Sequence, residues 1–263
     1  MQVTFAGLNH DIASSRLRAF IPQDELLKYG IVKGRDILVY GKHVVGMEIA
    51  KRFRLRVYDI CDDHFHTIHE IYYRLHAKEA DLITVNSEAM REIVLRETGR
   101  EATVIPDPYE SVEVKAGMGE GTLWFGHESN LKTIESYRDL IDVVLTHPEW
   151  TREKQIQAIK ECAFVLLPTD ERKGKSANRL IEAIINGRFV IAGELPAHDE
   201  FKPWMWIGDI REGLEWAQNN RNECVERVRR CQDYIRDKFS PETIGKLWLE
   251  TLEKLWRLRL IQN

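Results

Sequence analysis

Cysteine is scarce in this chain, and long apolar runs are missing. Only four cysteines occur among 263 residues, at positions 61, 162, 224 and 231, and none belongs to a CxxC pair. This spacing does not indicate a zinc site, and reduced thiols are expected. No segment approaches the roughly 20 apolar residues that cross a bilayer. The opening MQVTFAGLNHD lacks the features of a signal peptide, so we expect a cytoplasmic protein.

The chain also has no large excess of positive or of negative charge. The net charge of −4 and the pI of about 6.2 do not favour nucleic acid or an anionic membrane as partner. One basic cluster, KRFRLR at 51–56, stands out. Arg52, Arg54 and Arg56 would share a face in an extended segment and contact phosphates there. The alternative is a solvated helix end.

Strand-like and helix-like patterns alternate through the first third of the chain. Strands are predicted at Val3–Leu8, Asp36–Tyr40, Leu55–Ile60, Leu82–Asn86 and Ala102–Ile105. Helices are predicted at 15–29, 43–53, 63–79 and 87–98. Ser87 is placed to cap the last of these helices, and Gly99 to end it. Such alternation indicates a parallel sheet covered on both faces.

The alternation restarts after a stretch with two prolines and three glycines. Strands are predicted at Thr122–Gly126, Ala163–Leu167, Phe189–Ala192 and Trp204–Ile207, and helices at 131–143, 151–161, 177–186 and 211–238. Ser240 and Pro241 begin a last helix. The predicted fold class is α/β, with two doubly wound, Rossmann-like parallel-sheet domains. Their predicted extents are 1–107, a linker 108–120, 121–240, and a helix 241–263 that packs back on the first domain.

The segment 166–192 joins an apolar run, a polar loop, a short helical pattern and a second apolar run. Its Gly-Lys-Ser is not a Walker loop, because Thr169 stands where that motif needs glycine. Ser176 would cap the helix, and its first turn with Lys175 and Arg179 suits a diphosphate. Glu182, one and a half turns on, would accept hydrogen bonds from ribose. A solvated helix face is the alternative.

Several motifs in order resemble those of the retaining family-four glycosyltransferases of the GT-B fold. They are Ala80–Ser87, Val104–Pro108, Leu123–Gly126 with Lys132, Pro168-Thr169, Glu182–Val190, and Phe239–Glu242 with Trp248. The resemblance implies that the second domain binds a nucleoside-diphosphate sugar. It places Glu182 on the ribose, and Gly126, His127 and Lys132 beside the donor phosphates.

The chain departs from that family at one carboxylate. Gly174 stands eight residues before Glu182, where the family has glutamate. Asp170 or Glu171 is a candidate substitute in a loop that is longer than the family's. If neither carboxylate substitutes, the donor site would use Lys175, Ser176, Asn178 and Arg179 instead.

Residues after the strands of the first domain are the candidates for the acceptor side. Asp62, Asp63 and His64 follow a predicted strand and are the candidate catalytic residues, the alternative being helix capping by either aspartate. Ser15, Arg16 and Lys42 follow other strands and are candidate acceptor contacts. The alternatives are that Ser15 only caps a helix and that Lys42 is an ordinary surface lysine. His64 and His66 would lie about 200° apart on a helix, which disfavours a shared metal ion.

The expected function is transfer of a sugar from a nucleoside-diphosphate sugar to a hydroxyl acceptor. No cofactor and no metal are expected. The acceptor is left open between a saccharide, a lipid-linked molecule and a modified nucleic-acid base. A non-catalytic binding protein of the same fold and an epimerase that acts on the activated sugar are competing hypotheses.

Overall fold

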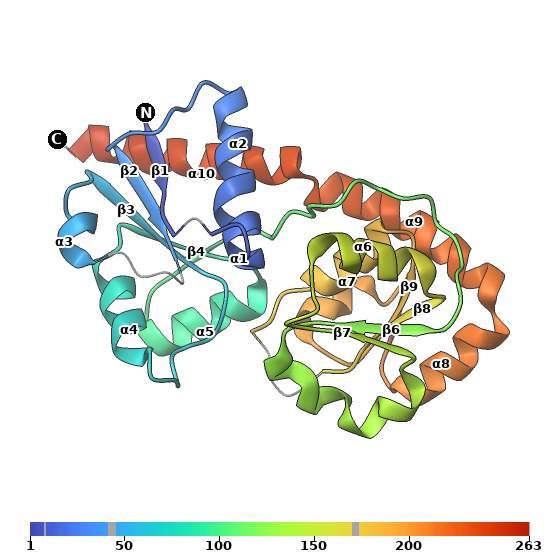
Figure 1. Ribbon diagram of the computed structural model, residues 1–263. Helices are drawn as coiled ribbons and strands as arrows, with labels where there is room; N and C mark the ends of the chain where they lie inside the picture. Colours follow the sequence, from blue (N-terminus) through green and yellow to red (C-terminus); the bar gives the residue numbers. More distant parts are fainter. Residues whose placement is uncertain (8, 42–45, 170–173, 263) are drawn as a thin grey trace. The chain divides into compact units, whose positions relative to one another are not determined.

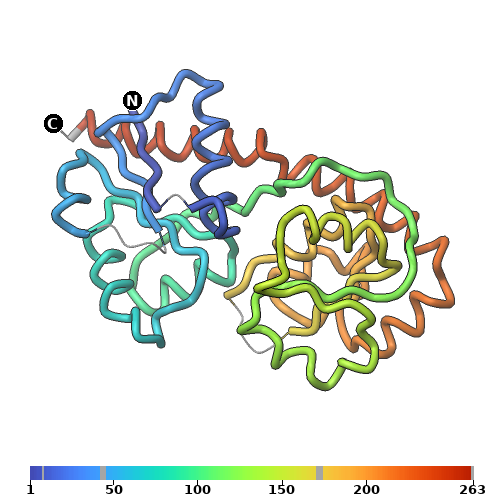
Figure 2. The backbone as a smooth tube through the Cα atoms, viewed as in Figure 1, coloured from blue at the N-terminus to red at the C-terminus, as the bar shows by residue number. Residues whose placement is uncertain are grey.

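The computed structural model describes residues 1–7, 9–41, 46–169 and 174–262. The chain forms two compact units. The first contains Met1–Glu110, Gly174–Ser176 and Lys238–Asn263, and the second contains Ser111–Lys173 and Ala177–Asp237. Both ends of the chain, blue and red in Figure 2, therefore belong to the first unit. No described helix is long and apolar enough to span a membrane.

The first unit contains a five-stranded parallel sheet whose strand order follows the sequence, β1-β2-β3-β4-β5 (Figure 1). Its strands are β1 (Val3–Phe5), β2 (Ile37–Tyr40), β3 (Leu55–Ile60), β4 (Leu82–Val85) and β5 (Thr103–Val104). Its helices are α1 (Ala13–Ser15), the π-helical η1 (Arg16–Phe20), α2 (Ile21–Lys28), α3 (Met47–Ala50), α4 (Glu70–Glu79), α5 (Glu88–Thr98) and α10 (Pro241–Gln262).

Alternate residues of β2 point to opposite faces of this sheet, as the pleat requires. Ile37 and Val39 pack with Leu26 of α2 and with α10. Leu38 and Tyr40 pack in the core that α4 and α5 cover. Helices thus bury both faces, which explains the continuous apolar strands. Ile244, Trp248 and Leu252 of α10 belong to the core that contains Ile37 and Val39.

A buried cation joins four parts of the first unit. Arg18, at 5% exposure, donates to both oxygens of Asp59 on β3, at 2.9 and 2.6 Å. Its Nη1 donates to Asp107 at 3.1 Å and to the carbonyl of Ile105 at 2.5 Å. The guanidinium lies 5.4 Å from the ring centroid of Trp248 on α10. Burial lowers the pKa of Arg18, but the two carboxylates outweigh burial and raise it above its ordinary value.

The second unit contains another five-stranded parallel sheet, in the order β10-β9-β8-β6-β7. Its strands are β6 (Thr122–Phe125), β7 (Val143–Leu145), β8 (Phe164–Leu167), β9 (Phe189–Ala192) and β10 (Trp206–Ile207). The helices are the 3₁₀ elements η2 (Glu128–Leu140) and η3 (Pro196–Phe201), with α6 (Arg152–Glu161), α7 (Asn178–Ile185) and α8 (Ile210–Asn219). The chain continues into α9 (Arg221–Phe239).

The predicted fold class is confirmed, and so are several helix ends. Ser87 caps α5 by accepting from the amide of Met90, and Gly99 ends that helix at φ 68°. Ser240 accepts from the amide of Thr243 and caps α10.

Other predicted elements are wrong in extent. The helix at 63–79 begins only at Glu70, because Asp63 caps a turn instead. The helix at 43–53 is α3 alone among described residues. The helix at 131–143 is 3₁₀ and is followed by a strand, β7, that the pattern did not predict. The helix at 211–238 is two helices, α8 and α9.

Replacing Arg18 tests the importance of the buried cation. Arg18→Ala leaves Asp59 and Asp107 buried without their cation, and we expect it to lower the free energy of unfolding by about 3–5 kcal/mol. Urea denaturation measures this loss. Arg257→Ala is the control, because that side chain is 74% exposed beside Glu253, and it should change little. Equal stability of the two variants would contradict the prediction.

Candidate functional site

The order of the second sheet identifies where a ligand would bind. The chain passes from β6 to its neighbour β7, and then returns to place β8 on the other side of β6. In open parallel sheets, ligands bind beyond the carboxyl ends of strands at such a reversal. Here these ends are Gly126-His127 after β6 and Pro168-Thr169 after β8. Two predicted donor-site residues, Gly126 and His127, therefore lie at this reversal.

Arg179, in the first turn of α7, lies against Gly126. Its Nη1 donates to the carbonyl of Phe125 at 3.2 Å, and its guanidinium is 6.0 Å from the ring centroid of Trp124. A Cβ at position 126 would stand 2.9 Å from that Nη1 and 3.1 Å from the Trp124 ring. Glycine at 126 thus leaves room for a cation at the end of β6. The structure brings together the predicted residues Gly126 and Arg179.

His127 has its Nδ1 engaged within its own loop. The Nδ1 accepts from the amide of Ser129 at 3.2 Å, as His127 caps η2. In the neutral ring the proton is then on Nε2, which makes that atom a donor. Lys132 lies further along η2 with an exposed side chain.

The beginning of α7 differs from the prediction in one respect. Ser176 is not the cap: the helix begins at Asn178, and the residue before it, Ala177, has no capping side chain. Lys175 and Ser176 are half-buried and precede the helix in the chain. Asp170 and Glu171, the candidate substitutes for the family's first glutamate, lie outside the described residues.

Glu182 is buried, at 6% exposure, so the solvated-face alternative is wrong for this residue. Its Oε2 accepts from the hydroxyl of Ser111 at 2.5 Å. Ser111 begins a segment, 111–120, that belongs to the second unit and whose amides pair with α7 and with the residues that follow it. Val114 donates to the carbonyl of Ile185 at 2.8 Å, and Gly117 donates to that of Gly187 at 3.1 Å. A residue outside α7 therefore orients the Glu182 carboxylate.

His198 was not singled out from the sequence. It is buried in η3, and its Nδ1 lies 2.9 Å from the carbonyl of Gly193, the residue that follows β9. Burial lowers the pKa of His198; the hydrogen bond to Gly193 opposes this effect, and the charge of Arg179 adds a smaller lowering. Its imidazole is therefore neutral at pH 7, with Nδ1 as donor. A buried histidine between Pro196 and Asp199 offers no periodic signal by which sequence could find it.

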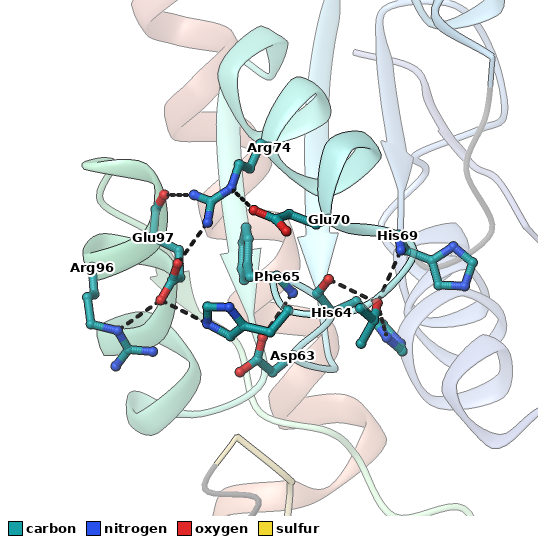
Figure 3. Close-up of polar contacts among 10 residues, drawn as sticks. Asp63, His64, Phe65, His69, Glu70, Arg74, Arg96 and Glu97 are labelled. Carbon is teal, nitrogen blue, oxygen red and sulfur yellow. Dashed lines mark hydrogen bonds and ion pairs between the residues drawn. The ribbon is translucent and has the colours of Figure 1, made fainter.

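The segment 62–70 at the carboxyl edge of the first sheet is folded by its own polar groups (Figure 3). Asp63 accepts from the amide of Phe65 at 3.0 Å and so caps a turn, whereas the helix-capping alternative is wrong for it because α4 begins at Glu70. The His64 ring meets His69 and Tyr73 edge-on, with centroids 5.5 and 5.3 Å apart. Asp62 is half-buried beside Cys61. The catalytic roles of Asp62, Asp63 and His64 stay predictions.

The remaining acceptor-side candidates have structural contacts of their own. Ser15 donates to the carbonyl of Gly7 at 2.8 Å. Arg16 forms a bidentate pair with Glu110, at 2.7 and 3.0 Å, and also donates to the carbonyl of His10. Lys42 lies outside the described residues.

Two other features considered from the sequence, a metal site and a basic face at 51–56, can be compared with the described part of the chain. Within it, no three His, Cys, Asp or Glu residues are grouped to hold an ion. Arg52 lies in a turn before β3, so it does not share an extended segment with Arg56. Lys51, Arg54 and Arg56 of the basic cluster lie 4.0, 3.6 and 3.2 Å from carboxylates of Glu48, Asp36 and Asp81, respectively. These pairs reduce the charge that a nucleic acid would meet.

Solved structures of similar fold exist. S. aureus TarM aligns with a TM-score of 0.59 and 16% identity, over 81% of this chain and 54% of TarM, so the chain spans about half its length. Anabaena Alr3699/HepE, in complex with UDP-glucose, aligns with a TM-score of 0.69 and 12% identity, over 97% of this chain and 100% of HepE. These neighbours are GT-B glycosyltransferases. The chain has the GT-B fold.

The GT-B assignment is one of fold, since the identities are low. No protein-family model matches the sequence, and no curated protein does. Membership of family four, which the motifs indicated, stays a prediction.

Removing the Ser111 hydroxyl tests its role beside Glu182. Ser111→Ala takes a donor from a buried carboxylate, and we expect it to cost about 1–3 kcal/mol of unfolding free energy. Ser136→Ala, at an exposed serine of η2, is the matched control and should be neutral. Urea denaturation of both variants decides the point, and a neutral Ser111→Ala would show that the carboxylate does not depend on this donor.

The lowered pKa of His198 predicts a pH dependence of stability. The unfolded chain takes up a proton near pH 6.5 and the folded chain resists it, so the unfolded state binds more protons. The free energy of unfolding should therefore fall as the pH drops from 7 to 5. His198→Gln should make this slope shallower, whereas His147→Gln, at an exposed histidine, should not. Parallel slopes in the wild type and His198→Gln would refute the prediction.

Proposed function

We propose that this GT-B chain transfers a sugar from a nucleoside-diphosphate sugar to a hydroxyl acceptor. The observation that carries the proposal is the placement of Arg179 over Gly126, at the strand ends where the order of the second sheet reverses. A fixed cation at this place suits the diphosphate of a donor. The fold shared with HepE, whose structure contains UDP-glucose, makes UDP-sugars the first donors to test.

The chemistry that this site would supply is stabilisation of the departing diphosphate. As the bond to the anomeric carbon breaks, negative charge grows on the phosphate oxygens. Arg179, the Nε2–H of His127 and the amides of the first turn of α7 would meet that charge without reorganising. In this proposal the side chains and the helix dipole stabilise the negative charge on the phosphate oxygens, and no metal is required.

Glu182 is the proposed ligand of the ribose hydroxyls. Ser111 donates to its Oε2, which fixes the carboxylate while it accepts from a diol. On the first unit, Asp62 and His64 are the proposed groups that orient the acceptor hydroxyl. Asp63 is the weaker candidate, since one of its oxygens already accepts from the Phe65 amide.

Titration with UDP and UDP-glucose tests the donor site. At 100-fold excess over the dissociation constant, binding should stabilise the protein by about 2.7 kcal/mol, seen as a rise in melting temperature. Arg179→Ala should weaken binding at least about tenfold, since it removes a charge-assisted hydrogen bond. Arg211→Ala is the control, because Arg211 also belongs to the second unit but pairs with Asp139 at its surface.

Two results would contradict this proposal. One is a wild-type protein that binds no nucleoside diphosphate or nucleotide sugar by isothermal titration. The other is equal affinity of Arg179→Ala and the wild type.

A non-catalytic binding protein of the same fold is the second candidate. The observation in its favour is Gly174, which stands where the family has a carboxylate for the donor sugar. Binding of UDP-glucose without release of UDP, across saccharide and lipid-linked acceptors, would favour this alternative. Release of UDP that depends on Arg179 would exclude it.

A further inference from the structure

Glu194 follows the carboxyl end of β9, at the same edge of the second sheet as the proposed donor site. Leu123 of β6 pairs with Val165 of β8. Leu167 of β8 pairs with Ala192 of β9, and the three strands therefore end nearly level. β8 lies between the other two strands (Figure 1). Since neighbouring strands are about 4.8 Å apart, the end of β9 is roughly 10 Å from that of β6, where the donor phosphates are proposed to bind.

The backbone that carries Glu194 is fixed by contacts within the second unit. The amide of Gly193 donates to the carbonyl of Leu167 at 3.0 Å, and its own carbonyl accepts from Nδ1 of His198 at 2.9 Å. The hydroxyl of Thr169 donates to the carbonyl of Glu194 at 3.2 Å. A Cβ at position 193 would stand 2.4 Å from that hydroxyl oxygen, so glycine allows this close approach of the two strand ends. The loop thus has one fixed position at the edge of the sheet.

The side chain of Glu194, in contrast, is exposed. Within the described part of the chain, no ion pair or hydrogen bond occupies its carboxylate. The nearby cation Lys202 pairs instead with Asp199, at 2.8 Å. The hydrogen bond with Asp199 is the main reason that the pKa of Lys202 is raised, and the charge of Glu194 is a minor one. Both oxygens of Glu194 are therefore available to accept hydrogen bonds from a ligand.

A carboxylate at this distance from a diphosphate site suits the sugar of the donor. It would repel phosphates, whereas neighbouring hydroxyls of a sugar ring can each donate to one of its oxygens. Arg179 lies close enough to this loop for its charge to act on His198, whose pKa is lowered mainly by burial and to a smaller extent by that charge. The sequence of groups in a donor, diphosphate and then sugar ring, thus fits the positions of Arg179 and Glu194 along the edge.

We propose that Glu194 binds hydroxyls of the donor sugar and thereby selects an uncharged sugar over a sugar acid. The selection follows from charge, because the carboxylate of a uronic acid would meet that of Glu194, and like charges in contact oppose binding. This assignment rests on the proposed function, and it specifies the class of donor that the function uses.

Isothermal titration with UDP, UDP-glucose and UDP-glucuronate tests this selection. The wild type should bind UDP-glucose more tightly than it binds UDP or UDP-glucuronate. Glu194→Gln should lower the affinity for UDP-glucose about tenfold or more, because it removes charge-assisted hydrogen bonds, and should leave the affinity for UDP unchanged. The same variant should raise the affinity for UDP-glucuronate, a gain that a merely structural role would not produce.

Glu215→Gln is the matched control, because Glu215 is an exposed glutamate of α8 in the same unit. This variant should bind all three ligands like the wild type.

Several results would overturn this assignment while leaving donor binding intact. One is a wild type that binds UDP-glucose no more tightly than UDP, or that binds UDP-glucuronate as tightly as UDP-glucose. Another is a Glu194→Gln variant whose affinity for UDP-glucose is unchanged, or whose affinities for UDP and UDP-glucose fall equally. A wild type that binds none of the three ligands overturns the proposed function as well, so the two failures can be distinguished.

Discussion

The parallel direction of the strands is the constraint on which the other features of this protein depend. Because all strands in a sheet point one way, every carboxyl end lies on one edge, and the residues that follow the strands gather there. In the first unit that edge holds the contacts of Arg18 with Asp59 and Asp107. In the second it holds Arg179 over Gly126. Each sheet thus presents a fixed guanidinium near its carboxyl edge, with a different degree of burial.

These two arginines differ in burial, and this difference indicates different functions for them. Arg18 is enclosed by carboxylates and by Trp248, so its charge is compensated within the unit. Arg179 is only half-buried, and its Nη1 donates to a neutral carbonyl. A half-buried guanidinium is accessible to a ligand from solvent, whereas that of Arg18, at 5% exposure, is not. This difference in burial is the physical reason for placing the donor on the second unit.

Local signals made much of the fold predictable, whereas long-range pairs did not show in the sequence. Ser87 and Gly99 mark the ends of α5 within a few residues, and both predicted ends are confirmed. The strand β7 is only three residues long and follows a helical pattern, so periodicity could not reveal it. Ser111 and Glu182 meet across 71 positions, and Arg18 and Asp59 across 41. An aspartate inside an apolar strand was the available clue to the second pair.

The first unit is assembled from both ends of the chain, and this has a consequence for its synthesis. Ile244, Trp248 and Leu252 complete the core that β1 and β2 begin. On the ribosome, the first sheet emerges long before the helix that seals one of its faces, while the second unit lies almost entirely between them. The nascent first unit must therefore keep an apolar surface exposed until α10 has been synthesised, and chaperones would bind such a surface.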